Sequence, residues 1–286
     1  MKKLTVFCAA ACLAASAAAQ NHPDLHEVLD RQKGRNLIEI PKGTYTLDVR
    51  NNGPYKFHNL TDVHINGNGS TVICNNQEQA FSFYNCVRVE LRDLTIDYDP
   101  LCFTQGEITA VAEDGSWFDV RIDKGYPVTG LAANRVQFYD PQTRLLKRNS
   151  ITTYTSNYSA LKQLGHNLFR AVKNGTWSAG EQVGDLVVMD VKTDKPNAGV
   201  HTVMLNKCYN TKLENVTVYG SNTFSFFEKE GYANEYRNCV VDRGPMPQCI
   251  RPRLRSGNAD GIHSSQARKG PTVTGCKVCL LYTSDA

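Results

Sequence analysis

The sequence predicts an all-β protein, a right-handed parallel β-helix with an inserted antiparallel β subdomain. Two observations support this prediction. A short pattern of apolar, Asp or Asn and β-branched residues recurs along the chain, and a long span with strands at hairpin spacing interrupts the recurrence. A repeat of about 20 to 50 residues is too small to bury its own apolar face, so neighbouring repeats must stack on one another.

The recurring unit is a short alternating strand followed by a polar turn. CVRVELRDLTID (Cys86 to Asp97) and CYNTKLENVTVY (Cys208 to Tyr219) align without a gap. The same pattern is found in LTDVHI (Leu60 to Ile65), YRNCVV (Tyr236 to Val241) and VTGCKV (Val273 to Val278). The alignment gives a step of 31 residues from Leu60 to Leu91 and 23 residues from Leu213 to Tyr236. Asp62, Asp93, Asn215 and Asn238 are predicted at the turns, where short polar side chains tolerate unusual dihedrals.

The organisation along the chain follows from these repeats. Residues 1–19 have a basic start, a short apolar run and small residues at a cleavage position, which predicts a secretory signal peptide and a secreted or periplasmic protein. Residues 20–98 and 204–278 are predicted to form the coils, with a helix over His22 to Gln32 covering the open end. Residues 99–203 are predicted to form the inserted subdomain, barrel-like or sandwich-like, from strands in GEITAVAEDGSWFDVRI, RVQFYD and GDLVVMDV.

The last eight residues, CLLYTSDA at 279–286, match one translated frame of a transposon-end sequencing adapter. We therefore expect them to be foreign to the natural protein, which would be longer than this chain. The missing part would complete the active site, so we expect this chain to be inactive.

Composition excludes some classes of function. The formal charge of +4 falls to +2 without Lys2 and Lys3, a weak balance that argues against a nucleic-acid partner. The N-terminal apolar run is too short to cross a bilayer, so no transmembrane segment is expected. Seven of the ten cysteines remain without the two ends, and none has zinc-ligand spacing. No metal or other cofactor is expected.

The predicted site lies in RPRLRSGNADGIHSSQARKGP (Arg251 to Pro271). Asp260 stands between Gly257 and Gly261, with Arg253 and Arg255 before it and His263 after it. Glycines allow a substrate to approach closely, and nearby arginines keep a carboxylate ionised, as a general base requires. Asp97, Asp99 and Asp242 are the other acids near strand ends, and for Asp97 and Asp242 a turn-stabilising role is favoured over catalysis.

Four stretches resemble a known family. IPKGTY (Ile40 to Tyr45), INGNGS (Ile65 to Ser70), LTIDYDPLCFTQGEITAV (Leu94 to Val111) and NADGIHSSQARKGPTVTGC (Asn258 to Cys276) are similar to secreted bacterial β-helix proteins of the pectate-lyase-like superfamily. Within it, the sequence resembles the glycoside hydrolase family 110 α-1,3-galactosidases. The family has an Asp-Ala-x-His segment, matched by Asp260 and His263 with Gly261 in place of the alanine, and an Asp-Asp pair about one coil later, which is absent here.

The resemblance implies an inverting glycoside hydrolase acting on an oligosaccharide or polysaccharide, with Asp260 in the catalytic base set. His263, Arg253, Arg255, Glu228 and Asn258 are the expected substrate-binding residues, with Glu228 at a turn between coils. Tyr98, Phe103 and Phe227 are either a sugar platform or core. Two alternatives remain open: a polysaccharide lyase that uses the basic cluster to neutralise a uronate, and a non-catalytic glycan-binding or surface β-helix protein.

Overall fold

The computed structural model describes residues 22–147, 158–176, 178, 180–192, 200–245 and 251–279. These residues form three β-sheets and two short helices, so the all-β prediction is confirmed. The predicted signal peptide lies outside the described residues, as does the C-terminal segment apart from Cys279.

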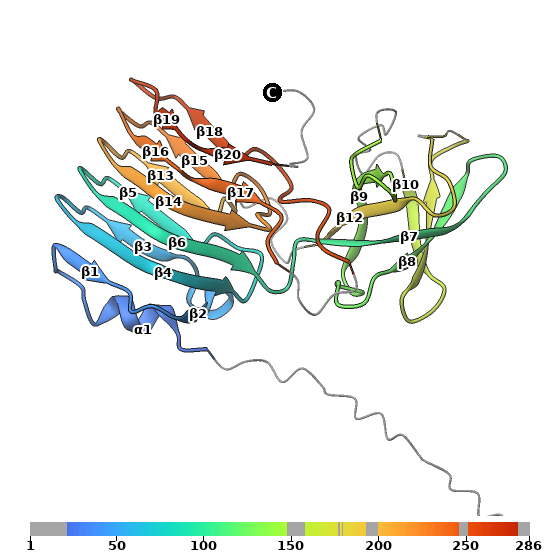
Figure 1. The fold of residues 1–286 in the computed structure, drawn as a ribbon, viewed down its shortest axis with the longest axis horizontal. Coiled ribbons are helices and arrows are strands. Elements are labelled where there is room, and N and C mark those ends of the chain that lie inside the picture. Colours follow the sequence, from blue (N-terminus) through green and yellow to red (C-terminus); the bar gives the residue numbers. More distant parts are fainter. Residues whose placement is uncertain are drawn as a thin grey trace, which may run out of the picture.

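Two of the sheets contain only parallel strands, and we call them sheet A and sheet B. Sheet A contains β1 (Leu37–Glu39), β2 (Thr44–Leu47), β4 (His64–Cys74), β6 (Glu90–Tyr98), β14 (Lys212–Tyr219), β16 (Glu235–Arg237), β17 (Val240–Asp242), β19 (Thr272–Thr274) and β20 (Lys277–Val278). Sheet B contains β3 (Tyr55–His58), β5 (Phe81–Tyr84), β13 (Val203–Asn206), β15 (Phe226–Lys229) and β18 (Ile262–Ser265). The chain alternates between the two sheets, so each passage adds one layer to a stack of coils (Figure 1).

Alternation along the strands explains the stacking. In β6, Leu91, Leu94 and Ile96 are buried while the residues between them are more exposed. Side chains of a strand point alternately to its two faces, so one face of each sheet fills the inside of the coils. In sheet B, Phe57 and Phe83 stack there with ring centroids 4.8 Å apart. One continuous apolar core results, which runs through all the coils.

The registers confirm most of the predicted repeat alignment. Leu213 pairs with Leu91 on one side and with Tyr236 on the other, and Tyr236 pairs with Val273. The predicted phase of LTDVHI is wrong. Ile65 pairs with Leu91, a step of 26 residues rather than 31 from Leu60. The stretch that aligns with Leu91–Ile96 is Ile65–Val72, and an irregularity between its residues Asn66 and Ser70 hides the repeat, because sequence spacing alone does not reveal it.

The turn residues follow the same correction. Asp93 in β6, Asn215 in β14 and Asn238 between β16 and β17 have positive φ of 55°, 53° and 52° and occupy equivalent positions of successive coils. The Asn215 side-chain amide donates to Asp93 Oδ1 at 2.8 Å across the stack. Asp62 also has a positive φ, but it lies in a different turn beside Arg88. The four short polar residues thus have the unusual dihedrals that were predicted, but Asp93 and Asn215 lie within strands rather than at turns, and Asp62 was aligned with the wrong positions.

The predicted helix is present as α1 (Leu25–Asp30), which lies at the end of the stack beside β1 and β2 (Figure 1). Asp24 caps it by accepting from the His26 backbone N–H, and Leu25 and Leu29 are buried in the coil core. The second helix, α2 (Val49–Asn52), is a single turn capped by Asp48. The helix α1 therefore covers apolar side chains of the first coil.

The third sheet is antiparallel and interrupts the coils between β6 and β13. This inserted sheet contains β7 (Phe103–Val111), β8 (Trp117–Ile122), β9 (Leu131–Tyr139), β10 (Tyr158–Gln163), β11 (Leu168–Lys173) and β12 (Leu186–Val191). The sheet curls into a barrel-like shape around its own apolar core. In Figure 1 it lies beyond the carboxyl ends of β4, β6 and β14.

A short segment, residues 251–256, joins the inserted sheet to the stack. Leu254 is fully buried in the core of the inserted sheet, and its backbone N–H donates to Gln105 Oε1 at 3.0 Å. Arg255 donates to Asp190 of β12, while Arg253 donates to Asp97 of β6. The two cores are therefore tied together through three consecutive side chains.

Candidate functional site

Four rings gather on the outer face of sheet B, and we call them the ring ladder: His201, Phe224, Phe227 and His263. The Phe224 ring lies between the two histidines, with centroids 4.8 Å from His201 and 4.2 Å from His263 and interplanar angles of 7° and 4°. Phe227 is tilted against His201 at 4.3 Å. All four side chains are half-buried, so the ladder forms part of the accessible surface.

Strand register brings these rings together. Thr202 N–H donates to the Phe224 carbonyl, and Ser225 N–H donates to the Asp260 carbonyl, so positions 201, 224 and 260 align across the coils. Three residues further along the same passages of chain, residues 204, 227 and 263 align in the same way. Neighbouring parallel strands lie about 4.8 Å apart, which allows His201 and Phe224 to stack at equal positions, while Phe224 stacks on His263 of the second aligned set.

Asp260 lies at the edge of this ladder. Its Oδ2 is 2.8 Å from Nδ1 of His263, and the two side chains are 46% and 37% exposed. In the neutral tautomer of His263 that donates Nδ1–H to this carboxylate, Nε2 is a hydrogen-bond acceptor. The structure therefore brings together the two residues that the predicted motif contained, in a position open to solvent.

His201 forms the other end of the ladder, with its Nδ1 3.0 Å from the Thr223 hydroxyl. Burial and the neighbouring His263 lower the pKa of His201 to about 4. The ring is consequently neutral at neutral pH. A neutral imidazole can accept a hydrogen bond as well as donate one, which suits contacts with hydroxyl groups.

The prediction for Glu228 is wrong in its geometry. Glu228 lies within β15 rather than at a turn, and its side chain is fully buried on the inner face of sheet B. Its carboxylate accepts from the Asn234 side chain at 2.8 Å and from the Ser264 hydroxyl at 3.1 Å. Because Phe227 and Glu228 are consecutive, they point to opposite faces, and Glu228 cannot reach a ligand on the ring ladder.

Arg253 and Arg255 lie away from Asp260. Arg253 makes a bidentate ion pair with Asp97, with both N–O distances 2.8 Å, and its side chain is 3% exposed. Arg255 is fully buried, donates to Asp190 at 2.8 Å and lies over the Phe103 ring. The structure thus pairs the two predicted arginines with other carboxylates, and Phe103 is a core residue.

Asn258 and the flanking glycines also have structural surroundings. Asn258 is buried, with its amide 3.5 Å from the Asn222 side-chain oxygen. A Cβ at Gly257 would lie 2.2 Å from the Ser221 hydroxyl, and one at Gly261 would lie 2.6 Å from the Val278 side chain. The glycines were predicted to admit a substrate, whereas here they allow neighbouring coils to pack closely.

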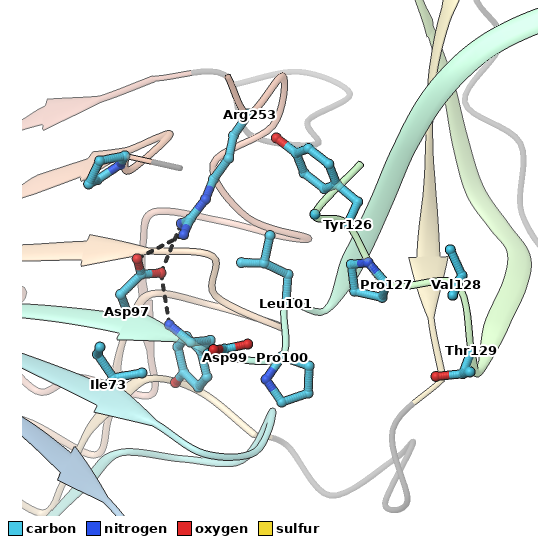
Figure 2. Close-up of a pocket in the computed structure, with 13 residues that line it drawn as sticks. Ile73, Asp97, Asp99, Pro100, Leu101, Tyr126, Pro127, Val128, Thr129 and Arg253 are labelled. Carbon is cyan, nitrogen blue, oxygen red and sulfur yellow. Dashed lines mark hydrogen bonds and ion pairs between the residues drawn. The ribbon is translucent and has the colours of Figure 1, made fainter. Parts of the chain in front are cut away.

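The remaining acids near strand ends fall on the side of sheet A. Asp242 accepts from Lys277 at 2.8 Å and from the Arg243 backbone N–H. Asp97 and Asp99 line a cavity of about 480 Å³ between the coils and the inserted sheet (Figure 2). Tyr98, a predicted platform aromatic, is buried between the sheets and donates to the Glu78 carbonyl and the Thr202 hydroxyl.

Sequence reasoning missed His201, Thr223 and Phe224. The signal was present, because HTVM (His201 to Met204), FSFF (Phe224 to Phe227) and DGIH (Asp260 to His263) occupy equal places in three coils. The strands of sheet A repeat with more similar residues, so they dominate the repeat pattern of the sequence. The strands of sheet B share fewer residues, although their equal places in the coils put the rings in one patch.

The described residues show neither a membrane-spanning helix nor a metal-binding cluster. No helix among them is long and apolar enough to cross a membrane. Within the same residues, no group of three or more His, Cys, Asp or Glu side chains is arranged to hold a metal ion.

Comparison with known proteins gives little further identification. No protein-family model and no curated protein matches the sequence. Among solved structures, the chain is similar to the tailspike protein gp49 from Pseudomonas phage LKA1, with 10% sequence identity and a TM-score of 0.21. The match covers 86% of this chain and 45% of the tailspike chain, so this chain spans under half of that protein. The likeness is too distant to carry a functional argument.

Proposed function

We propose that the chain is a carbohydrate-active, right-handed parallel β-helix protein that binds a glycan on the ring ladder, with Asp260 and His263 as its main polar contacts. The observation that supports this most is the half-exposed Asp260–His263 pair directly beside the stacked rings. Ligand sites typically combine aromatic or apolar surface with a few polar groups that fix orientation. The ladder offers both within one patch.

The polar groups at the ladder suit hydroxyl donors. Asp260 Oδ1 and His263 Nε2 have no partner among the described residues, so both can accept hydrogen bonds from a sugar. The two arginines that a uronate-binding lyase would need are engaged in ion pairs with Asp97 and Asp190. These contacts favour a neutral glycan over a polyuronate, and α-galactosides are the first class to assay.

The finer proposal is inverting hydrolysis of an α-galactoside, with Asp260 in the base set that activates water. An inverting enzyme also needs a carboxylic acid about 6.5 to 9.5 Å from the base. Glu228 faces the inside of the coils, and Asp97 and Asp242 are held by Arg253 and Lys277. Glycan binding does not depend on finding that second acid, so binding is the function to test first.

The test is a glycan-array screen followed by titration of the best neutral ligand. Phe224→Ala removes the central ring of the ladder and should weaken binding about tenfold or more, in the range of losses from truncating a well-packed interface aromatic. Tyr84→Ala is the matched control, because Tyr84 is an exposed aromatic on β5 of the same sheet. Wild-type affinity in Phe224→Ala, or preferential binding of polyuronates by the wild-type chain, would refute the proposal.

A further inference from the structure

The cavity between the coils and the inserted sheet is separate from the ring ladder. Its walls come from two parts of the fold: Asp97 to Leu101, where the chain leaves β6, and Gly125 to Thr129, a loop of the inserted sheet. Figure 2 shows Tyr126, Pro127, Val128 and Thr129 across from Asp99, Pro100 and Leu101. Its volume of about 480 Å³ lies within the range of about 300 to 1,000 Å³ that is usual for small-molecule sites.

The charged side chains that line the cavity limit the classes of ligand that it can bind. Arg253 is the one cation among the described lining residues, and both of its terminal nitrogens donate to Asp97. Asp99 is exposed, and its carboxylate has no hydrogen-bond or ion-pair partner in the described part of the chain. An anionic ligand would meet the unpaired Asp99 carboxylate without a free cation to balance it. Because Arg253 is already neutralised by Asp97, the lining keeps one net negative charge, and anionic ligands are the disfavoured class.

The surface of the cavity suits a ligand with both hydroxyl groups and an apolar face. Ile73, Pro100, Leu101, Pro127 and Val128 form apolar walls, and the carboxylates of Asp97 and Asp99 accept hydrogen bonds. Asp97 is fixed in orientation by Arg253 and by the Tyr98 backbone N–H at 2.8 Å. A pyranose ring has this combination, since its C–H groups form an apolar face and its hydroxyls lie around the edge.

We infer that this cavity is a second carbohydrate subsite, which holds one neutral sugar unit with hydroxyls donating to Asp97 and Asp99. The inference rests on the proposed glycan-binding function and adds a location and a charge class to it. The short segment from Tyr219 to Phe224 links the cavity and the ring ladder along the chain. Tyr219 ends β14 beside Asp97, and Phe224 belongs to the ring ladder.

Photoaffinity labelling of the full chain with a diazirine-bearing α-galactoside tests the location directly. Labelled peptides are mapped by mass spectrometry, with a diazirine-bearing galacturonide as the charged comparison. The inference predicts labelling of residues 125–129 or 97–101 by the galactoside, and little labelling by the galacturonide.

Two variants make the assignment specific. Val128→Trp should fill the cavity and reduce labelling of these peptides about tenfold, whereas Val183→Trp, at a 64% exposed position outside the cavity, should not. Asp99→Asn changes no packing and should weaken galactoside binding by up to about tenfold, the effect expected from one charge-assisted hydrogen bond. Glu113→Gln, an exposed carboxylate in the hairpin between β7 and β8, is its matched control.

The outcomes separate this inference from the proposed function. Labelling confined to the peptides of the ring ladder would overturn the second subsite and leave the proposed function standing. Labelling of the cavity that Val128→Trp does not reduce would also overturn it. If the galactoside labels neither region above the galacturonide, both the subsite and glycan binding at the ladder are wrong.

Discussion

At the scale of single residues, two bidentate Asp–Arg pairs separate the effect of burial from that of geometry. Asp97–Arg253 is almost fully enclosed between the coils and the inserted sheet, while Asp62–Arg88 has both side chains 55% exposed. Removing one partner of a buried pair leaves an uncompensated charge, so Asp97→Ala should lower the free energy of unfolding by about 3 to 5 kcal/mol. Urea unfolding followed by circular dichroism measures it.

The exposed pair is the control for this prediction. Asp62→Asn removes the negative charge from an ion pair of the same geometry and accepts the positive φ of this position. Water solvates the remaining Arg88, so the unfolding midpoint should change little. Equal destabilisation by Asp97→Ala and Asp62→Asn would contradict the burial argument. Arg253 was predicted to bind substrate, and its partner could not be foreseen because Asp97 is 156 residues away in sequence.

His201 gives a prediction for the dependence of stability on pH. Its pKa in the folded chain is about 4, mainly because of burial, whereas an unfolded histidine titrates near 6.5. Between these values the unfolded state binds the extra proton, so stability should fall as the pH decreases from about 6.5 to about 4. His201→Phe keeps a ring in the ladder and should reduce this decrease. Urea midpoints at pH 7.5 and 5 measure it, with His166→Phe at an exposed position as control.

If the difference in urea midpoint between pH 7.5 and 5 is unchanged in His201→Phe, other groups cause the pH dependence.

The ring ladder shows which site residues could be predicted from sequence. Asp260 and His263 were found because they are close in sequence, and Phe227 was found as an aromatic. His201 and Phe224 become neighbours only through strand register, so nothing in their local sequence identified them.

At the scale of elements, Asp93, Asn215 and Asn238 occupy equivalent positions of successive coils that require residues able to accept positive φ. Asn215→Ala should cost about 1 to 3 kcal/mol, because alanine is strained in this region and the bond to Asp93 is lost. Asn215→Gly accepts the same dihedral and should cost less. Thermal unfolding of the two variants gives the comparison, and an alanine variant as stable as the glycine variant would refute the argument.

The strands were more predictable than their phase. Alternating apolar residues identified β6, β14 and the hairpin of β7 and β8, since each buries one face. The irregularity in β4 was not predictable, because three residues between Asn66 and Ser70 are accommodated without a partner in β6. Glu228 was misplaced for a related reason. A charged residue in FFEKEG suggests a turn, and its buried partners Asn234 and Ser264 come from other parts of the chain.

At the scale of the whole molecule, the coils and the inserted sheet have separate apolar cores joined through residues 251–256. Leu254 belongs to the core of the inserted sheet, although the strands before and after it in sequence, β17 and β18, belong to the coils. Leu254→Ala should destabilise the inserted sheet by about 2 to 5 kcal/mol and leave the coils largely protected. Hydrogen exchange with mass spectrometry resolves the two parts, and equal loss of protection in both would contradict their separate cores.

The most direct test of the account is calorimetric titration of an α-galactoside ligand into the wild-type chain, Asp260→Asn and Glu230→Gln. Glu230 is an exposed carboxylate that follows β15 at the end away from the ring ladder, so it controls for the loss of a charge. The account predicts binding by the wild-type chain and Glu230→Gln, with affinity reduced about tenfold in Asp260→Asn. Equal affinity in all three proteins, or no binding by the wild-type chain, would contradict glycan recognition at Asp260.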